Sequence, residues 1–117
     1  MSHGAMETYS LIGIVSSAHL NDVARVLTDK NIGALGVYAH NAHDLVGVVT
    51  ERDLVHALAR GLDPEQTAVT EVMTGSPIVA EGPISRWEAA RLMHEGDVRH
   101  LIVRDGEGHR IVSIRDI

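Results

Sequence analysis

The sequence predicts an α+β protein made of two α/β-type repeats, each with the order strand, helix, strand, strand, helix. The main observation is an internal duplication. Leu20–Val37 matches Arg86–Val103, and Gly47–Leu54 matches Arg110–Ile117, in the same order along the chain. The second observation is that apolar residues with helical spacing alternate with short apolar runs rich in β-branched residues. That alternation is typical of amphipathic helices followed by buried strands.

The first repeat begins with a short apolar strand and a helix. Leu20, Val23 and Leu27 have the spacing of one helical face. Asn31 is expected to end this helix because asparagine tolerates the left-handed conformation, and Gly61 is expected to end the second helix for the same reason. The expected elements are strands Leu11–Val15, Ala34–Tyr38 and Leu45–Val49, and helices from Leu20 to Lys30 and from Glu51 to Arg60.

The second repeat copies this order. Its expected elements are strand Pro77–Ala80, helix Arg86–Glu95 and strands His100–Arg104 and Arg110–Val112. The sequence stops at Ile117, where a second helix should begin, so this last helix is expected to be missing. Each repeat alone would bury little surface. We therefore expect a shared core across a pseudo-twofold axis, with a cleft between the halves where a ligand could bind.

The domain boundaries follow from these matches. Residues 1–10 are expected to be an N-terminal leader outside the fold, and Met1 to Met6 look like residues added for expression. Residues 11–62 form the first repeat, residues 63–71 a linker and residues 72–117 the second repeat.

Composition narrows the function classes. The chain has 117 residues, 44% of them hydrophobic, with no Phe, so its core must be aliphatic. The net charge of −6 argues against nucleic acid as the main partner, because a phosphate backbone repels an acidic chain. The absence of Cys excludes disulfides and thiolate metal sites. No apolar run is long enough to span a membrane and no secretory signal is evident, so a cytoplasmic protein is expected.

Two matched motifs are the best candidates for a ligand site. Thr50-Glu51-Arg52-Asp53 and Ser113-Ile114-Arg115-Asp116 each follow an apolar strand and are expected to open a helix. A helix N-terminus attracts phosphate, a hydroxyl can add a hydrogen bond, and an Asp can accept from both hydroxyls of a ribose. The alternative is a capping box, in which the hydroxyl and the carboxylate serve only the helix. The recurrence of the motif in both repeats favours a functional site.

With these motifs the chain resembles the cystathionine-beta-synthase (CBS) domain family over nearly all of Leu11 to Ile117. DKNIGALGV with LVGVVTERDL in the first half, and EGDVRHLIV with RIVSIRDI in the second, carry the resemblance. Val72-Met73-Thr74 before Pro77 is similar to the segment that opens a CBS repeat. The resemblance implies a tandem CBS pair, or Bateman module, that regulates rather than catalyses.

The resemblance also implies a ligand and its contacts. An adenosyl ligand such as AMP, ADP, ATP or S-adenosylmethionine would bind between the repeats, with no cofactor required. Asp53 and Asp116 would contact ribose. The phosphates would lie near the hydroxyl and basic residues Thr50, Arg52, Ser113, Arg115, Arg99 and His100. Adenine would lie against apolar backbone near Val15 and Ser16 or near Val79.

Some residues depart from the pattern and leave alternatives open. Gly33 stands where the second repeat has Arg99, and Arg110 stands where the first repeat has Gly47, so the two sites should be unequal. Arg110 could block its site or supply charge to it. A ligand-free structural or protein-interaction module remains the competing interpretation.

Other side chains are given simpler roles. The eight histidines show no metal-ligand spacing and no nucleophile motif is present, so neither a metal site nor an enzyme is expected. Trp87 is expected to pack at the start of its helix. Exposed apolar helix faces predict a homodimer.

Overall fold

The computed structural model describes residues 5–40, 43–106 and 108–117. It has the α+β architecture expected from the duplication and divides into two compact units. One unit is Ile12–Pro77, and the other combines Ile78–Ile117 with the N-terminal residues up to Leu11. Each unit has its own four-stranded sheet and its own apolar core.

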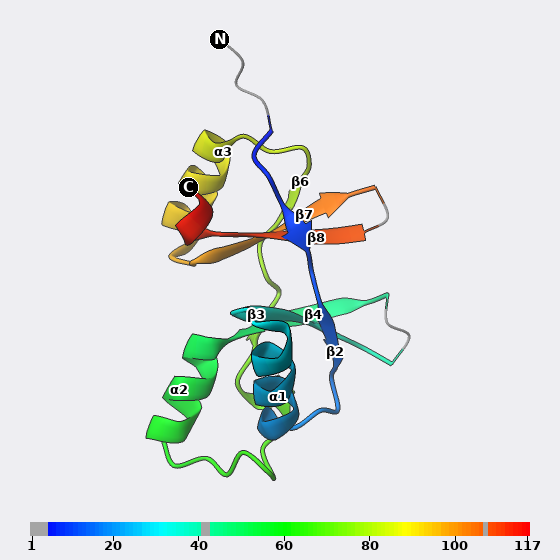
Figure 1. The fold of residues 1–117 in the computed structure, drawn as a ribbon, viewed down its shortest axis with the longest axis vertical. Coiled ribbons are helices and arrows are strands. Elements are labelled where there is room, and N and C mark those ends of the chain that lie inside the picture. The colour runs from blue at the N-terminus through cyan, green and yellow to red at the C-terminus, as the bar shows by residue number, and fades with distance from the viewer. Residues whose placement is uncertain (1–4, 41–42, 107) are drawn as a thin grey trace. The chain divides into compact units, whose positions relative to one another are not determined.

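The sheet of the first unit has the strand order β2-β3-β4-β5. Strand β2 is parallel to β3, and the other neighbours are antiparallel. In Figure 1 both long helices of this unit cover one face of its sheet. The elements are β2 (Gly13–Val15), α1 (Leu20–Lys30), β3 (Ala34–Tyr38), β4 (Leu45–Thr50), α2 (Glu51–Ala59), the 3₁₀ turn η1 (Val69–Glu71) and β5 (Thr74–Gly75).

Alternation along β3 decides which side chains enter the core of the first unit. Leu35 and Val37 are fully buried and pack with Val23 and Leu27 of α1. Helix α1 ends at Asn31, which adopts the left-handed conformation with φ of 54°. The position of this helix and its stop are therefore as the apolar spacing and the asparagine predict.

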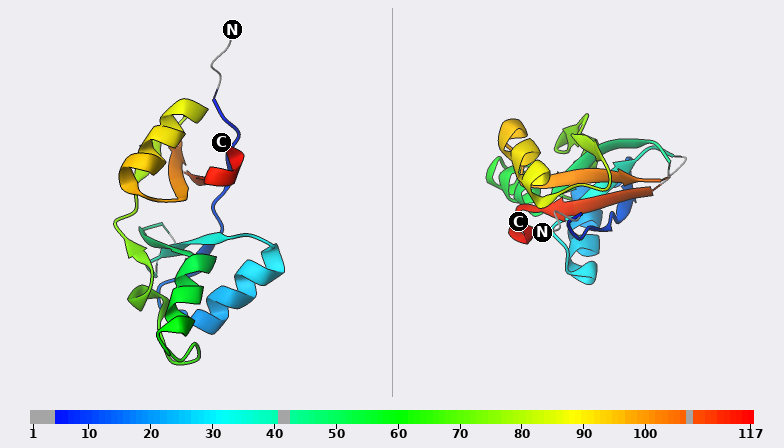
Figure 2. Two further views of the ribbon diagram at one scale, coloured as in Figure 1. Left: turned by 90° about the vertical axis from the view of Figure 1, so that its left-hand side faces the viewer. Right: turned by 90° about the horizontal axis from the view of Figure 1, so that it is seen from above.

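The sheet of the second unit has the order β1-β8-β7-β6, with the same parallel and antiparallel pairings around its central strands. Figure 2 shows α3 beside this sheet from two further directions. Its core joins Ala89 and Met93 of α3 to Leu101, Val103 and Val112 of the sheet. The elements are β1 (Tyr9–Ser10), β6 (Val79–Glu81), α3 (Arg86–Gly96), β7 (His100–Asp105), β8 (Gly108–Ser113) and the 3₁₀ turn η2 (Ile114–Asp116).

Two edge strands differ from the expected boundaries. Tyr9 and Ser10, expected in a leader outside the fold, pair with Ile111 and Arg110 of β8. Thr74 and Gly75, expected at the start of the second repeat, pair with β4 of the first unit. These pairings satisfy backbone groups of β8 and β4, which would otherwise lie at an open edge of their sheets. Strand β1 precedes the first repeat but belongs to the sheet of the second unit, and β5 precedes the second repeat but belongs to the sheet of the first.

Residues 63–71, expected as a linker, pack against the start of α1. The amide of Leu20 donates to the carbonyl of Thr67 at 3.1 Å, and Val69 donates to Ala18 at 2.8 Å. Val69 is fully buried in the core of the first unit. This segment is therefore part of that unit, because its backbone and an apolar side chain both find partners there.

The Gly47 and Arg110 positions are explained by packing within each unit. A Cβ on Gly47 would lie 2.4 Å from Sδ of Met73, so Met73 fills that space. Arg110 instead ties β1 to β8: its guanidinium donates to Oγ1 and the carbonyl of Thr8 at 2.9 and 2.6 Å and to Oγ of Ser10 at 3.2 Å. The guanidinium of Arg110 is therefore engaged by the N-terminal segment, and a blocked ligand site or a charge supplied to that site stays a prediction.

We expect Arg110→Ala to lower the free energy of unfolding by about 1–2 kcal/mol, because two part-buried hydrogen bonds to Thr8 and an exposed one to Ser10 are lost. Hydrogen exchange at Tyr9 and Ser10 should also become faster. The matched control is Arg104→Ala, which removes one exposed contact to Glu81 and should cost at most about 1 kcal/mol. Equal effects of both substitutions on unfolding and exchange would contradict this role of Arg110.

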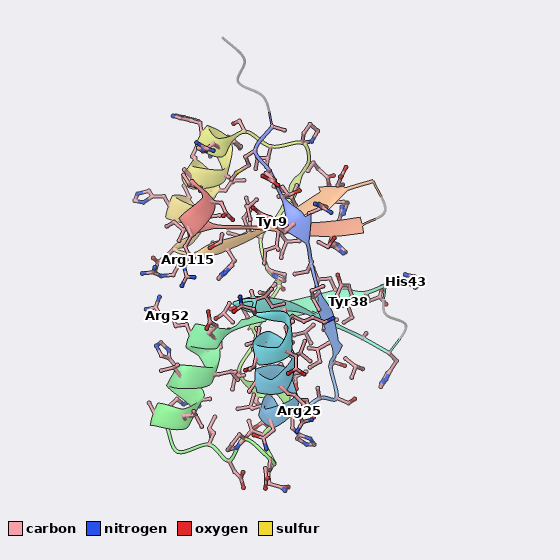
Figure 3. All side chains as sticks on the ribbon, in the orientation of Figure 1. Tyr9, Arg25, Tyr38, His43, Arg52 and Arg115 are labelled. Atoms are coloured by element: carbon pink, nitrogen blue, oxygen red, sulfur yellow. The ribbon has the colours of Figure 1, made fainter. Side chains whose placement is uncertain are left out.

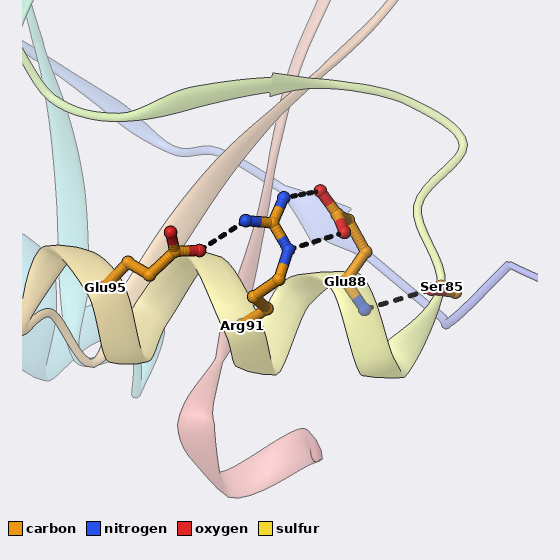
Figure 4. Close-up of polar contacts among 4 residues, drawn as sticks. All are labelled: Ser85, Glu88, Arg91 and Glu95. Atoms are coloured by element: carbon orange, nitrogen blue, oxygen red, sulfur yellow. Dashed lines mark hydrogen bonds and ion pairs between the residues drawn. The ribbon is translucent and has the colours of Figure 1, made fainter.

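Helix α3 corrects one expectation and shows a surface ion-pair network. Trp87 does not pack at the helix start but is 75% exposed. Figure 4 shows Arg91 bridging Glu88 and Glu95, while the hydroxyl of Ser85 caps the helix by accepting from the amide of Glu88 at 3.1 Å. The hydrogen bond from Arg91 lowers the pKa of Glu88 below its ordinary value. Since these charges face solvent, they add little stability.

Candidate functional site

The first candidate motif lies where β4 ends and α2 begins. The amide of Thr50 donates to Oδ2 of Asp53 at 2.8 Å, and the amide of Asp53 donates to Oγ1 of Thr50 at 3.2 Å. The capping box is therefore formed. It engages only Oδ2 of the carboxylate in this exchange, and a carboxylate has a second acceptor oxygen. The box thus orients Asp53 without using all of its capacity to accept hydrogen bonds.

The second motif forms a similar cap, in which the hydroxyl bonds to a residue nearer in the chain. The amide of Ser113 donates to Oδ2 of Asp116 at 3.2 Å, while Oγ of Ser113 accepts from the amide of Arg115 at 3.3 Å. The hydroxyl reaches one residue less far than Thr50 does because the turn here is a short 3₁₀ helix. Figure 3 shows Arg52 on the first turn of α2 and Arg115 in the turn after β8. Both arginine side chains are exposed.

One backbone contact relates Gly33 to Arg99. The amide of Glu51 donates to the carbonyl of Gly33 at 3.0 Å, and the amide of Ile114 donates to the carbonyl of Arg99 at 2.8 Å. The two residues thus hold equivalent positions beside the two motifs, as the sequence match predicts. The structure therefore places Arg99, which is exposed, next to the turn that carries Ser113 and Arg115.

His100 also lies beside the second motif. It is the first residue of β7 and stands opposite Ser113 of β8 in the antiparallel pair. Its side chain is half-buried and engaged in an interaction. Within the second unit the structure therefore gathers Arg99, His100, Ser113, Arg115 and Asp116 at one end of the sheet.

The expected adenine contacts fall in different places. Val15 pairs with Tyr38, and the amide of Ser16 donates to the carbonyl of Tyr38 at 2.8 Å. Thr50 lies opposite Ala34 at the other end of β3, roughly 13 Å away at about 3.3 Å per residue. Within the first unit Val15 and Ser16 are therefore not brought to Thr50, because β4 runs back along β3 while β2 runs forward.

Val79 lies closer to its own motif. It pairs with Ile102 of β7, and His100 at the start of that strand faces Ser113. By strand register its equivalent in the first unit is Gly13 rather than Val15, since Gly13 pairs with Gly36 as Val79 pairs with Ile102. The alternation of apolar residues could not reveal this offset, because both strands are short apolar runs.

Glu51 is the residue near the motifs that the sequence interpretation passed over. A Cβ on Gly33 would lie 2.8 Å from Oε1 of Glu51, so the carboxylate lies against the Gly33 backbone. The aligned motifs contain the difference that points to Glu51, because its equivalent in the second motif is the apolar Ile114. The sequence alone does not show that the Glu51 carboxylate reaches Gly33.

Within residues 5–40, 43–106 and 108–117, no three His, Asp or Glu side chains cluster as metal ligands would. No helix of that same part has both the length and the apolar character needed to cross a bilayer. The polar turn that holds His40 and His43 includes Asn41 and Ala42, which lie outside the described residues.

Burial raises the pKa of the Tyr38 phenol above its ordinary value.

Two sheets of similar topology, each with a capped motif that pairs a hydroxyl with an Asp, define a module of two tandem repeats. The family model of the CBS domain matches twice, at residues 6–60 and 69–117. The chain belongs to the CBS domain family and contains two of its repeats. The first match includes the N-terminal strand that had been assigned to a leader.

This chain is similar to curated proteins of different lengths. The CBS domain-containing protein CBSCBSPB2 of Arabidopsis thaliana is 39% identical over 98 residues, which cover 82% of this chain and 18% of that protein. The uncharacterized protein YlbB of Bacillus subtilis is 31% identical over 100 residues, covering 82% of this chain and 66% of that protein. This chain thus spans less than a fifth of the Arabidopsis relative.

Solved structures share the fold closely. The CBS domain protein PAE2072 from Pyrobaculum aerophilum, complexed with AMP, has a TM-score of 0.81 and 26% identity over 92% of this chain and 82% of that one. The putative signal-transduction protein with CBS domains from Burkholderia ambifaria has a TM-score of 0.81 and 31% identity, covering 92% and 79%. The hexameric CBS-CP12 protein from bloom-forming cyanobacteria has a TM-score of 0.83 and 29% identity, covering 96% and 65%.

Proposed function

We propose that this chain is a non-catalytic regulatory module that binds an adenine nucleotide or another adenosyl ligand and acts in the cytoplasm as an energy or metabolite sensor. The observation that carries the proposal is the oriented Asp at the same place in both repeats, Asp53 and Asp116, each held by its cap. The AMP complex of the Pyrobaculum protein supports the choice of ligand class. AMP, ADP, ATP and S-adenosylmethionine are the candidates.

The side chains have distinct proposed roles. An ionised Asp only accepts hydrogen bonds, which suits the two hydroxyls of a ribose. Arg99 presents a planar guanidinium that can hold phosphate oxygens in pairs. Thr50, Ser113, Arg52, Arg115 and His100 would add polar contacts to the ligand, and Val15, Ser16 and Val79 remain proposed contacts of the base.

A thermal-shift series tests the ligand class. A ligand that binds only the folded state stabilises it by about 2.7 kcal/mol when its concentration is about a hundred times Kd. We therefore expect AMP, ADP, ATP or S-adenosylmethionine to raise Tm by several degrees. GMP and GTP are the matched controls, since they keep the ribose and phosphates but change the base. Unchanged Tm with every adenosyl compound at millimolar concentration would reject the proposal.

The alternative, a protein-interaction module, has two observations in its favour. The hydroxyl and carboxylate groups of both motifs are already paired within their caps and need no ligand to be satisfied. Exposed apolar side chains also lie on the helices, with Val55 at 62%, Leu58 at 59% and Trp87 at 75% exposure. A homodimer, proposed for either function, would cover such residues.

Sedimentation velocity at micromolar concentration should show this dimer. Val55 and Leu58 are three residues apart on α2 and so share a helical face. Leu58→Glu should shift the protein towards monomer, because a carboxylate is costly to bury in an apolar contact. Gln66→Glu adds the same charge at an exposed turn and should leave sedimentation unchanged. A wild-type protein that sediments as a monomer would rule out the dimer at that concentration.

A further inference from the structure

The two equivalent sheet ends carry opposite charge. In the first motif, Arg52 stands between two acidic residues in the chain, Glu51 and Asp53, and residue 33 is a glycine without a side chain. Around the second motif, Arg99 and Arg115 outnumber the single carboxylate of Asp116, and Ile114 replaces the glutamate. The two motifs share the same backbone hydrogen bonding but differ in the sign of the net charge of the side chains around them.

The position of Glu51 makes this difference specific. The Glu51 carboxylate reaches back over Gly33, where a Cβ would be 2.8 Å from its Oε1. In the second unit that place is the origin of the Arg99 side chain, because Gly33 and Arg99 accept the same backbone hydrogen bond. The Glu51 carboxylate of the first unit thus lies where the Arg99 side chain begins in the second unit. The glycine permits this arrangement, since a side chain at residue 33 would displace the carboxylate.

We infer that Glu51 is a specificity-determining residue that excludes phosphate from the first motif, so that this end accepts the unphosphorylated nucleoside part of a ligand or a cationic adenosyl compound. Phosphate is directed to the end that holds Arg99 and Arg115. The inference rests on the proposed adenosyl-binding function. The physical cause is Coulomb repulsion, which at a few ångströms from an exposed carboxylate changes anion affinity by about three- to tenfold.

The test compares AMP with adenosine by titration calorimetry in two reciprocal variants. Glu51→Gln removes the charge but keeps the side-chain shape, and it should raise the affinity for AMP by about three- to tenfold while leaving adenosine unchanged. Ile114→Glu introduces the charge at the second end and should lower AMP affinity by a similar factor, again without effect on adenosine. Ile114 is 45% exposed, so the substitution places the new carboxylate in contact with solvent.

Glu65→Gln is the matched control, because Glu65 is exposed in a turn of the same unit and its loss changes the net charge equally. It should leave both affinities unchanged. If wild type binds AMP and Glu51→Gln binds it with the same affinity, the inference about Glu51 is wrong while the proposed function stands. The same conclusion follows if Glu51→Gln changes the affinities for AMP and adenosine equally. Absence of binding of both ligands to wild type and variants overturns the proposed function and this inference together.

Discussion

Replacing Leu35 with alanine should lower the free energy of unfolding by about 2–5 kcal/mol, the range found when a buried leucine is truncated. Leu35 is fully buried on the central strand β3 and packs in the core with Val23 and Leu27. The loss combines the transfer of its methyl groups with the cavity left behind, because closely packed neighbours relax only in part. Urea unfolding followed by circular dichroism measures the change.

Leu101→Ala should have an effect of the same size, since Leu101 is the equivalent fully buried residue of β7 in the second unit. Thr28→Ala on the exposed side of α1 serves as the control and should change stability by no more than about 0.5 kcal/mol. If either leucine variant stays within about 1 kcal/mol of wild type, the core assigned to its unit is wrong.

Asp53→Ala is expected to weaken AMP binding by about 1–3 kcal/mol, or about 5- to 150-fold in Kd, if Asp53 accepts hydrogen bonds from the ribose. The substitution also removes the carboxylate that pairs with the amide of Thr50. Loss of that cap should lower the free energy of unfolding by about 0.5–2 kcal/mol. Calorimetry measures the first effect and urea unfolding the second.

Helix α1 offers the control that separates these two effects. Asp22 accepts from the amide of His19 at 2.9 Å and so plays the same capping role at a helix with no proposed ligand contact. Asp22→Ala should reduce stability in a similar way and leave AMP affinity unchanged. A parallel loss of AMP binding in both variants would assign the effect of Asp53 to helix capping, and equal affinity in wild type and Asp53→Ala would remove Asp53 from the site.

Much of the candidate site could be predicted because it depends on local pattern. The hydroxyl and the Asp of each motif are three residues apart, so the first turn of any helix or 3₁₀ turn brings them together. The match of Gly33 with Arg99 also followed from aligned repeats and is confirmed by their shared backbone contact. The position of Val15 and Ser16 at the opposite end of β3 from Thr50 could not be predicted this way, because strand direction and register are not encoded locally.

The sequence by itself determined the order of the main elements, the buried face of α1 and the end of that helix. These depend on apolar spacing and on single residues such as Asn31, whose conformational preference acts over one turn. The tertiary structure alone decided which segments complete the sheets, what Arg110 binds and where the Glu51 carboxylate lies. Arg110 and Thr8 are far apart in the chain, and an edge strand of two residues has too little pattern to be recognised. Such contacts arise only when packing brings distant backbone groups together and their hydrogen bonds must be satisfied.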